Sequence, residues 1–156
     1  MPSDHFWATL SNSLGAKGLR LVGKLNAPVY RLTRGRIGGR VGGAPILLLT
    51  TTGRKSGRQR TAPVLFIEDD GRLAVIDTNA GTGPIPAWSL NLKANPEAVV
   101  EIGKRRLAIR ARPAEGEERA DLWRKHNEQY AGFDEYEEKL DPSRPITVYV
   151  LEPAER

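Results

Sequence analysis

The chain of 156 residues contains no cysteine and only two histidines. Without cysteine there are no disulfides, thiolate metal sites or cysteine nucleophiles, and the composition fits a reducing compartment. His5 lies near the terminus and His126 lies in a polar, helix-like stretch. Two histidines so placed are too few for a histidine-based metal site or a Ser-His-Asp triad. We therefore expect neither a metal centre nor hydrolytic chemistry of that kind.

Long hydrophobic runs are also missing. No apolar stretch approaches the roughly 20 residues that a membrane-spanning helix needs, and the N-terminus lacks the apolar core and small-residue cleavage site of a signal peptide. A hydrophobic content of 39% with 28% charged residues is typical of a globular protein, and the length suits one domain. The sequence predicts a cytoplasmic protein.

Positive charge is concentrated in the first part of the chain. Residues 1–60 carry eleven Lys and Arg against one acid, which gives +10, whereas residues 61–156 carry thirteen against eighteen, which gives −5. These two values sum to the net charge of +5. Affinity for a polyanion is therefore expected in residues 1–60.

The N-terminal segment has the pattern of an amphipathic helix. Apolar residues recur at spacings of three and four over residues 6–34, with basic residues between them, and Pro28 should break or kink this helix. Two interpretations are open. The helix covers one end of the folded domain, or it contacts an anionic membrane surface through residues 6–40, at the inner face of the membrane. Residues 34–43 are rich in Gly and Arg and predict a mobile linker or lid, so residues 1–44 form a separate N-terminal segment.

The rest of the chain, residues 45–156, alternates hairpins with helices. We expect strands at residues 46–51, 61–68, 72–77, 98–102, 105–112 and 146–151, and helices at residues 86–94, 115–130 and 133–140. Strict alternation of strand and helix is absent, which disfavours a parallel doubly wound sheet. The predicted fold is mainly β, of the α+β type: a six-stranded antiparallel barrel with helical insertions, preceded by the N-terminal amphipathic helix.

The segment from Gly53 to Arg60 is the most distinctive. It follows an apolar, β-branched run and holds four cations, Arg54, Lys55, Arg58 and Arg60. Glycines here permit close backbone approach, and the cations can bind phosphate or carboxylate. The order of residues differs from a nucleotide P-loop, because Arg54 precedes the lysine where that motif has glycine. Charge alone does not distinguish an anion site from a solvated basic hairpin.

The flanking residues favour the anion site. Residues 48–57, Leu-Leu-Thr-Thr-Thr-Gly-Arg-Lys-Ser-Gly, followed by residues 60–64, Arg-Thr-Ala-Pro-Val, resemble the deazaflavin-dependent nitroreductase family, whose members use coenzyme F420. Residues 86–96 are similar to a second signature of that family, and a looser similarity runs from Glu117 to Ile146. Two separate matches of about ten residues at compatible spacing make the resemblance specific.

The resemblance implies a split β-barrel whose groove holds the coenzyme, with its phosphate and acidic tail near the basic loop. The positions that match phosphate-binding residues are Arg54, Lys55, Ser56 and Arg60. The positions that match the walls around the deazaflavin ring are Ala62, Pro63, Val64 and Leu65, then Ile76, Asp77, Thr78 and Asn79, then Ala87, Trp88 and Asn91. FMN is the alternative cofactor, because related barrels bind either group.

The implied activity is hydride transfer from the reduced coenzyme to a small hydrophobic acceptor, namely a quinone, an enone or a nitro compound. Two positions depart from the nitroreductase pattern: Asn79 replaces a lysine, and Phe133 replaces a tyrosine. Tyr130, Tyr136 and Thr78 are then the candidates for substrate positioning or proton supply. A non-catalytic module that carries a lipid or stores the cofactor is the alternative function.

Two expectations concern partners. The chain should act as a monomer or homodimer. Nucleic acid is not an expected partner, because no aromatic residues interleave with the basic loop as a base-stacking surface requires.

Overall fold

The structure, a computed structural model, describes residues 27–36, 40–41, 44–78, 84–129, 138 and 140–154. The predicted helical residues 6–26 and most of the predicted helix at 133–140 lie outside these ranges. Residues 27–33 are helical, as predicted.

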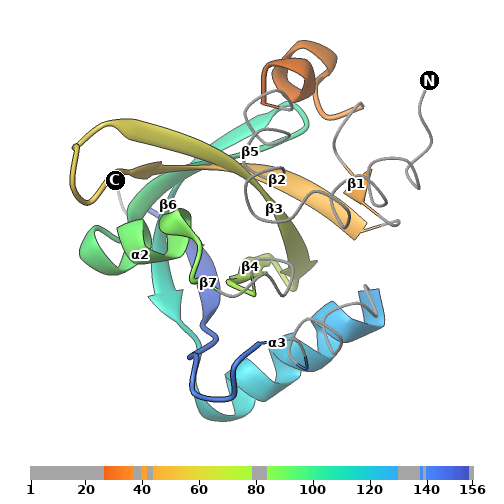
Figure 1. Cartoon of the computed structure of the whole chain (residues 1–156). Helices are drawn as coiled ribbons and strands as arrows, with labels where there is room; N and C mark the ends of the chain where they lie inside the picture. Colours follow the sequence, from red (N-terminus) through yellow and green to blue (C-terminus); the bar gives the residue numbers. More distant parts are fainter. Residues whose placement is uncertain are drawn as a thin grey trace.

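Six antiparallel strands form a closed barrel (Figure 1), in the order β2-β3-β4-β7-β6-β5 with a further pairing of β5 to β2. The strands are β2 (Ala44–Thr52), β3 (Gln59–Asp69), β4 (Arg72–Ile76), β5 (Glu97–Ile102), β6 (Arg105–Pro113) and β7 (Val148–Pro153). The barrel confirms the predicted fold class, and each strand lies within a few residues of its predicted range.

A short strand, β1 (Arg40–Val41), pairs with the start of β2 through Arg40↔Pro45 and Val41↔Ala44. The sequence pattern predicted an irregular linker over residues 34–43, which is wrong for these two residues. The paired residues lie only five and three positions apart in the sequence, so the pairing is local, and glycine-rich composition occurs in hairpins as well as in linkers.

Two further helices lie against the barrel (Figure 1): α2 (Ala87–Ala94) and α3 (Gly116–Gln129). Pro86 is the N-cap of α2, and its carbonyl accepts the N–H of Ser89 at 3.0 Å. Proline fits this position because an N–H there would have no partner within the helix. Asn95 ends the helix, in agreement with the prediction from Asn95-Pro96.

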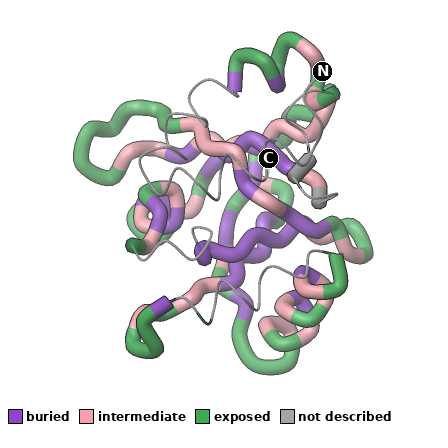
Figure 2. The backbone as a smooth tube through the Cα atoms, turned by 45° about the vertical axis from the view of Figure 1, so that its right-hand side comes forward, coloured by how far each residue is buried: buried purple, intermediate pink, exposed green. Residues whose placement is uncertain are grey.

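The core divides between the two faces of the strands. Leu47, Leu49, Val64 and Phe66 belong to a cluster that also holds Tyr149 and other alternating residues of each strand, which lie inside the barrel. The alternate residues of β7, Val148 and Val150, pack with Leu122 of α3 instead. This division confirms the predicted alternation along the last strand. Figure 2 shows the buried backbone concentrated in the middle of the molecule.

The strand β2 is apolar on both faces, and each face has a separate partner. Leu47 and Leu49 point into the barrel, whereas Leu48 packs against Ala27 and Tyr30 of the helical segment 27–33. An uninterrupted apolar run is the expected pattern for a strand buried on both sides. Helix 27–33 therefore covers the barrel, which agrees with one of the two interpretations of the N-terminal segment.

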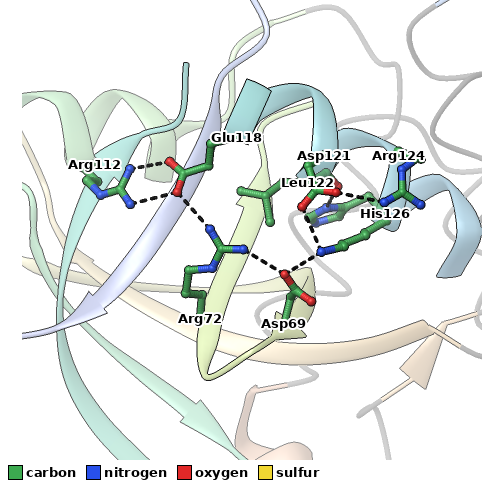
Figure 3. Close-up of polar contacts among 9 residues, drawn as sticks. Asp69, Arg72, Arg112, Glu118, Asp121, Leu122, Arg124 and His126 are labelled. Atoms are coloured by element: carbon green, nitrogen blue, oxygen red, sulfur yellow. Dashed lines mark hydrogen bonds and ion pairs between the residues drawn. The ribbon is translucent and has the colours of Figure 1, made fainter. Parts of the chain in front are cut away.

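Ion pairs fasten α3 to the strands below it (Figure 3). Glu118 accepts hydrogen bonds from Arg112 at 2.6 Å and Arg72 at 2.9 Å, and Asp69 joins Arg72 to Lys125 at 2.8 and 2.7 Å. Lys125, followed by Arg72, lowers the pKa of Asp69. Exposed single pairs contribute little to stability, so the connected arrangement chiefly fixes where α3 lies.

His126 of α3 is only 1% exposed, and its ring Nδ1 lies 2.9 Å from the carbonyl of Leu122. A carbonyl can only accept, so Nδ1 carries the proton of a neutral ring. Burial lowers the pKa of His126 to about 4, and hydrogen bonds to Leu122 and Ala74 oppose that shift only in part. His126 is thus a neutral core residue, and it belongs to no catalytic centre.

The buried histidine makes stability depend on pH. Its pKa is lower in the folded than in the unfolded state, so its stabilising effect is complete above about pH 6.5 and is lost as pH falls toward 4. The free energy of unfolding, measured by urea denaturation, should be roughly 2 kcal/mol lower at about pH 5 than at about pH 7.5. In His126→Gln this difference should disappear, because glutamine does not titrate. An unchanged pH dependence in the variant would contradict this assignment.

Candidate functional site

The loop between β2 and β3 is a tight turn closed by its own backbone. The N–H of Gly53 donates to the carbonyl of Arg58 at 2.7 Å, and the N–H of Gly57 donates to the carbonyl of Gly53 at 2.8 Å. Ser56 Oγ accepts the N–H of Arg58 at 3.2 Å. A Cβ at Gly53 would lie 2.7 Å from that oxygen, which explains the glycine. The Ser56 hydroxyl still has its hydrogen to donate to a ligand oxygen.

The cations of this loop are uncompensated. Arg54, Lys55, Arg58 and Arg60 are exposed, and none forms an ion pair with a carboxylate of the described residues. Elsewhere on the barrel and α3, by contrast, many cations are paired, as in Figure 3. Three unpaired cations on the short turn and a fourth, Arg60, at the start of β3 create a positive potential that an anionic ligand can neutralise.

Asn91 connects this loop to α2. Its side chain is 2% exposed; Oδ1 accepts the backbone N–H of Arg54 at 3.1 Å, and Nδ2 donates to Thr51 Oγ1 at 3.0 Å. The Arg54 guanidinium also approaches Oδ1, at 3.5 Å. The amide is thus occupied by the protein itself. Asn91 holds the loop at a fixed distance from the helix, and its predicted contact with the coenzyme stays a prediction.

The part of β3 that follows the loop has a strand on one side only. Residues 59–65 pair with β2, whereas β4 pairs with β3 only from Phe66 to Asp69. Along residues 59–65, no second strand among the described residues covers the other edge. Pro63 lies within this stretch, and proline is confined to strand edges because it cannot donate to a ladder. A ligand can therefore approach the strand here, next to the cationic loop.

A buried polar network organises the opposite side of the site. Asp77 is fully buried; Oδ2 accepts the hydroxyl of Ser89 at 2.6 Å and Oδ1 accepts the N–H of Thr147 at 2.7 Å. The hydroxyls of Ser89 and Tyr149 lie 2.8 Å apart. Arg144 donates to the carbonyls of Asp77 at 2.7 Å and Pro84 at 3.1 Å. The carboxylate of Asp77 therefore braces α2 against β4 and β7.

This network also positions Trp88. The ring of Trp88 meets Tyr149 edge-on, with centroids 5.9 Å apart and planes at 62°. Burial raises the pKa of Tyr149 most, and the charge of Asp77 adds to this effect, although the bond to Ser89 lowers it. The phenol therefore stays protonated at neutral pH. Tyr149 supports the indole and does not supply a titrating proton there.

The structure brings some of the predicted site residues together and buries others. The structure brings the basic loop, Asn91 and the open part of β3 together. Two predicted wall side chains are buried in the core, Val64 inside the barrel and Ile76 in the cluster under α3, and Leu65 is partly buried against that second cluster. Val64 and Leu65 lie on opposite faces of β3, as consecutive residues of a strand do. Thr78 is 3% exposed and Ala87 is exposed.

Asn79, Tyr130 and Tyr136 lie outside the described residues, as does Phe133. The sequence patterns also missed several residues that shape the site: Thr51, Ser89, Arg144 and Tyr149. A threonine at the end of a leucine run and a serine within the apolar side of a short helix were signals of buried hydrogen bonding.

The geometry fits a ligand with a flat ring and a phosphate. The glycine-containing turn and its unpaired cations suit the phosphate, and the open part of β3 suits the ring. The chain itself places no pair of nucleophile and base among the described residues of this region. Such a site binds and orients a reactive cofactor and leaves the chemistry to it.

Comparison with known proteins gives the same result. A family described as F420H(2)-dependent quinone reductase matches residues 22–153. The F420H(2)-dependent quinone reductase of Mycobacterium tuberculosis is 37% identical over 138 residues, which cover 86% of this chain and 91% of that protein.

Two solved structures also match. One, described as an F420-H2 dependent reductase, is 39% identical with a TM-score of 0.63, over 69% of this chain and 94% of that one. Another, described as a domain-swapped dimer, is 37% identical with a TM-score of 0.65, over 83% and 97%. The resemblance seen in the sequence is thereby confirmed at the level of F420-dependent reductases. The chain belongs to the F420H(2)-dependent quinone reductase family.

Proposed function

We propose that this protein is an oxidoreductase that uses reduced coenzyme F420 to reduce a quinone. The observation that carries the proposal is the unpaired cationic turn at residues 53–60, fixed by Asn91 beside the open edge of β3. The family and the M. tuberculosis relative are both named for this cofactor and this class of acceptor. FMN is the less favoured cofactor, since it has no acidic tail that would form ion pairs with so many cations.

Each group of site residues has a separate proposed role. Arg54, Lys55, Ser56 and Arg60 hold the phosphate and nearby carboxylates of the coenzyme through charge-assisted hydrogen bonds. Ala62 and the backbone of β3 lie along one side of the ring, and Trp88 and Ala87 lie on the other. When bound, the reduced coenzyme supplies the hydride. The acceptor also takes up a proton, for which Tyr130, Tyr136 and Thr78 are the proposed donors or positioning groups.

Location and assembly are part of the proposal. No helix of the described residues has the length and hydrophobicity needed to cross a membrane. We propose a cytoplasmic enzyme that contacts the membrane peripherally through residues 6–40, where a hydrophobic quinone resides. A homodimer is compatible with the relative described as a domain-swapped dimer.

The loop cations should dominate affinity for the coenzyme. A charged hydrogen bond contributes roughly 1.5–3 kcal/mol, so Lys55→Ala or Arg60→Ala should weaken binding of oxidised F420 about 10- to 150-fold. The double variant should cost less than the sum, since both cations share one anion. Titration of coenzyme fluorescence measures this, and Lys93→Ala, an exposed cation at the end of α2, is the control. Wild-type affinity in Lys55→Ala would refute the phosphate assignment.

Asn91 should matter for affinity although its amide faces the loop. Asn91→Ala removes the acceptor of the Arg54 N–H, so the loop should lose its fixed position and coenzyme binding should weaken about tenfold, the equivalent of one lost hydrogen bond. Asn95→Ala is the matched control on the same helix, because its side chain bonds only to the nearby N–H of Glu97 within the described structure. Equal affinity in the two variants would remove the positioning role.

Turnover needs its own assay. Anaerobic oxidation of reduced F420 should occur with menadione and be faster with quinones than with enones or nitro compounds. Coenzyme binding without turnover across this panel would favour the non-catalytic alternative, and tight binding of FMN alone would change the cofactor assignment.

A further inference from the structure

A second basic site lies where helix 27–33 meets the turn between β5 and β6. Gly35 and Gly103 both have positive φ, 80° and 57°, and a Cβ at Gly35 would lie 3.2 Å from the Cα of Gly103. The buried hydroxyl of Tyr30 accepts the N–H of Gly103 at 3.0 Å and donates to the carbonyl of Ile46 at 3.0 Å. The end of the helix and the turn are therefore held in contact, backbone to backbone.

This contact borders a cavity of about 410 Å³ that is open to solvent. Its lining comprises Tyr30, Arg31, Arg34, Glu101, Gly103 and Lys104. Arg31 pairs with Glu101 at 3.0 Å, whereas Arg34 and Lys104 form no ion pair with a carboxylate of the described residues. Three cations and one carboxylate leave the lining positively charged, so the cavity suits an anionic group.

The same helix presents an apolar ridge to solvent. Leu32 is 87% exposed and Val29 is 41% exposed, and Pro28 beside them is also exposed. Ala27 and Tyr30 are buried against the barrel, so the ridge occupies the opposite side of the helix. Exposing large aliphatic side chains has no benefit in water, and here they stand next to unpaired cations.

We propose that the cavity binds the phosphate headgroup of an anionic phospholipid while Val29 and Leu32 enter the acyl boundary. Cations beside an exposed aliphatic ridge are the combination that binds an anionic bilayer, because the two contributions add. A soluble anion would use the cations but not the ridge, and an apolar protein surface would use the ridge but not the cations.

This inference deepens the peripheral membrane contact of the proposed function. It adds residues of the β5–β6 turn, outside residues 6–40, and a defined headgroup site. Arg31 also donates to Thr61 Oγ1 on β3 at 3.4 Å, which places the lipid site near the strand that carries the open edge. A quinone leaving the bilayer would then have a short path to that edge.

The headgroup site is tested by flotation of the full chain with vesicles. The wild type should bind phosphatidylcholine vesicles that contain phosphatidylglycerol, and should not bind phosphatidylcholine alone. Arg34→Gln/Lys104→Gln should weaken binding about 25-fold, since each cation near the surface contributes about fivefold. Lys93→Gln/Arg110→Gln is the matched control, because it removes the same net charge from exposed positions elsewhere. Equal losses in the two double variants would indicate diffuse charge attraction and overturn the site.

The ridge is tested by labelling. The chain has no cysteine, so Leu32→Cys with an environment-sensitive dye reports a single position. Its emission should shift to the blue on anionic vesicles, whereas the dye at Glu128→Cys, on the exposed face of α3, should not respond. An unchanged emission at position 32 on anionic vesicles would overturn insertion. A blue shift that appears without vesicles and grows with protein concentration would also overturn it, because it would indicate self-association.

The two proposals fail separately. Coenzyme fluorescence in the absence of vesicles should be the same for Arg34→Gln/Lys104→Gln and the wild type, which also shows that the variant folds. A wild-type protein that binds vesicles but does not bind the coenzyme would count against the cationic loop at residues 53–60. No vesicle binding by the wild type, with coenzyme binding intact, would refute the lipid site alone.

Discussion

The buried amide of Asn91 is the constraint on which the site depends. The turn at residues 53–60 is closed by its own backbone hydrogen bonds, but its like charges repel one another, and nothing within it fixes its position relative to α2. Asn91 of α2 supplies that link, because it accepts from the backbone of Arg54 and donates to Thr51 on β2. The next residue, Leu92, packs into the barrel interior, so the amide is anchored by hydrophobic burial.

The opposite wall is also fixed by a buried polar group, in this case the carboxylate of Asp77. Asp77 is buried at the end of β4 and is satisfied by Ser89 and the N–H of Thr147. A buried carboxylate is tolerated only when it is fully hydrogen-bonded, and such a network specifies one arrangement. Both walls therefore use buried polar groups to fix α2, and α2 carries Trp88. This division suits an enzyme whose cofactor performs the chemistry, because precise placement is what the protein contributes.

Much of this was predictable from local pattern. The strands, the two hairpin turns and α2 follow from alternation, glycine positions and Pro86, and the basic loop stands out from charge. The two-residue strand β1 and the core positions of Val64 and Ile76 were not predicted. A family resemblance assigns positions to a wall but does not say which side chains the barrel itself requires.

The structural roles of Asn91 and Asp77 were not predicted, for a related reason. Both residues match family positions that line the coenzyme groove, and polar residues at such positions are usually assigned as ligand contacts. Their partners are 37 and 40 residues away for Asn91 and up to 70 residues away for Asp77, so only the three-dimensional pairing reveals that the amide and the carboxylate are already occupied.

The central claim is that the turn at residues 53–60 and the adjacent edge of β3 hold coenzyme F420. The most direct measurement is an NMR titration of isotope-labelled protein with oxidised F420, in which each backbone amide reports its own surroundings. The account predicts the largest shifts at Arg54 to Thr61, at Ala62 to Leu65 and at Ala87 to Asn91, with little change at the β3–β4 turn and the β5–β6 turn. Shifts confined to other parts of the barrel, or none at saturating coenzyme, would contradict it.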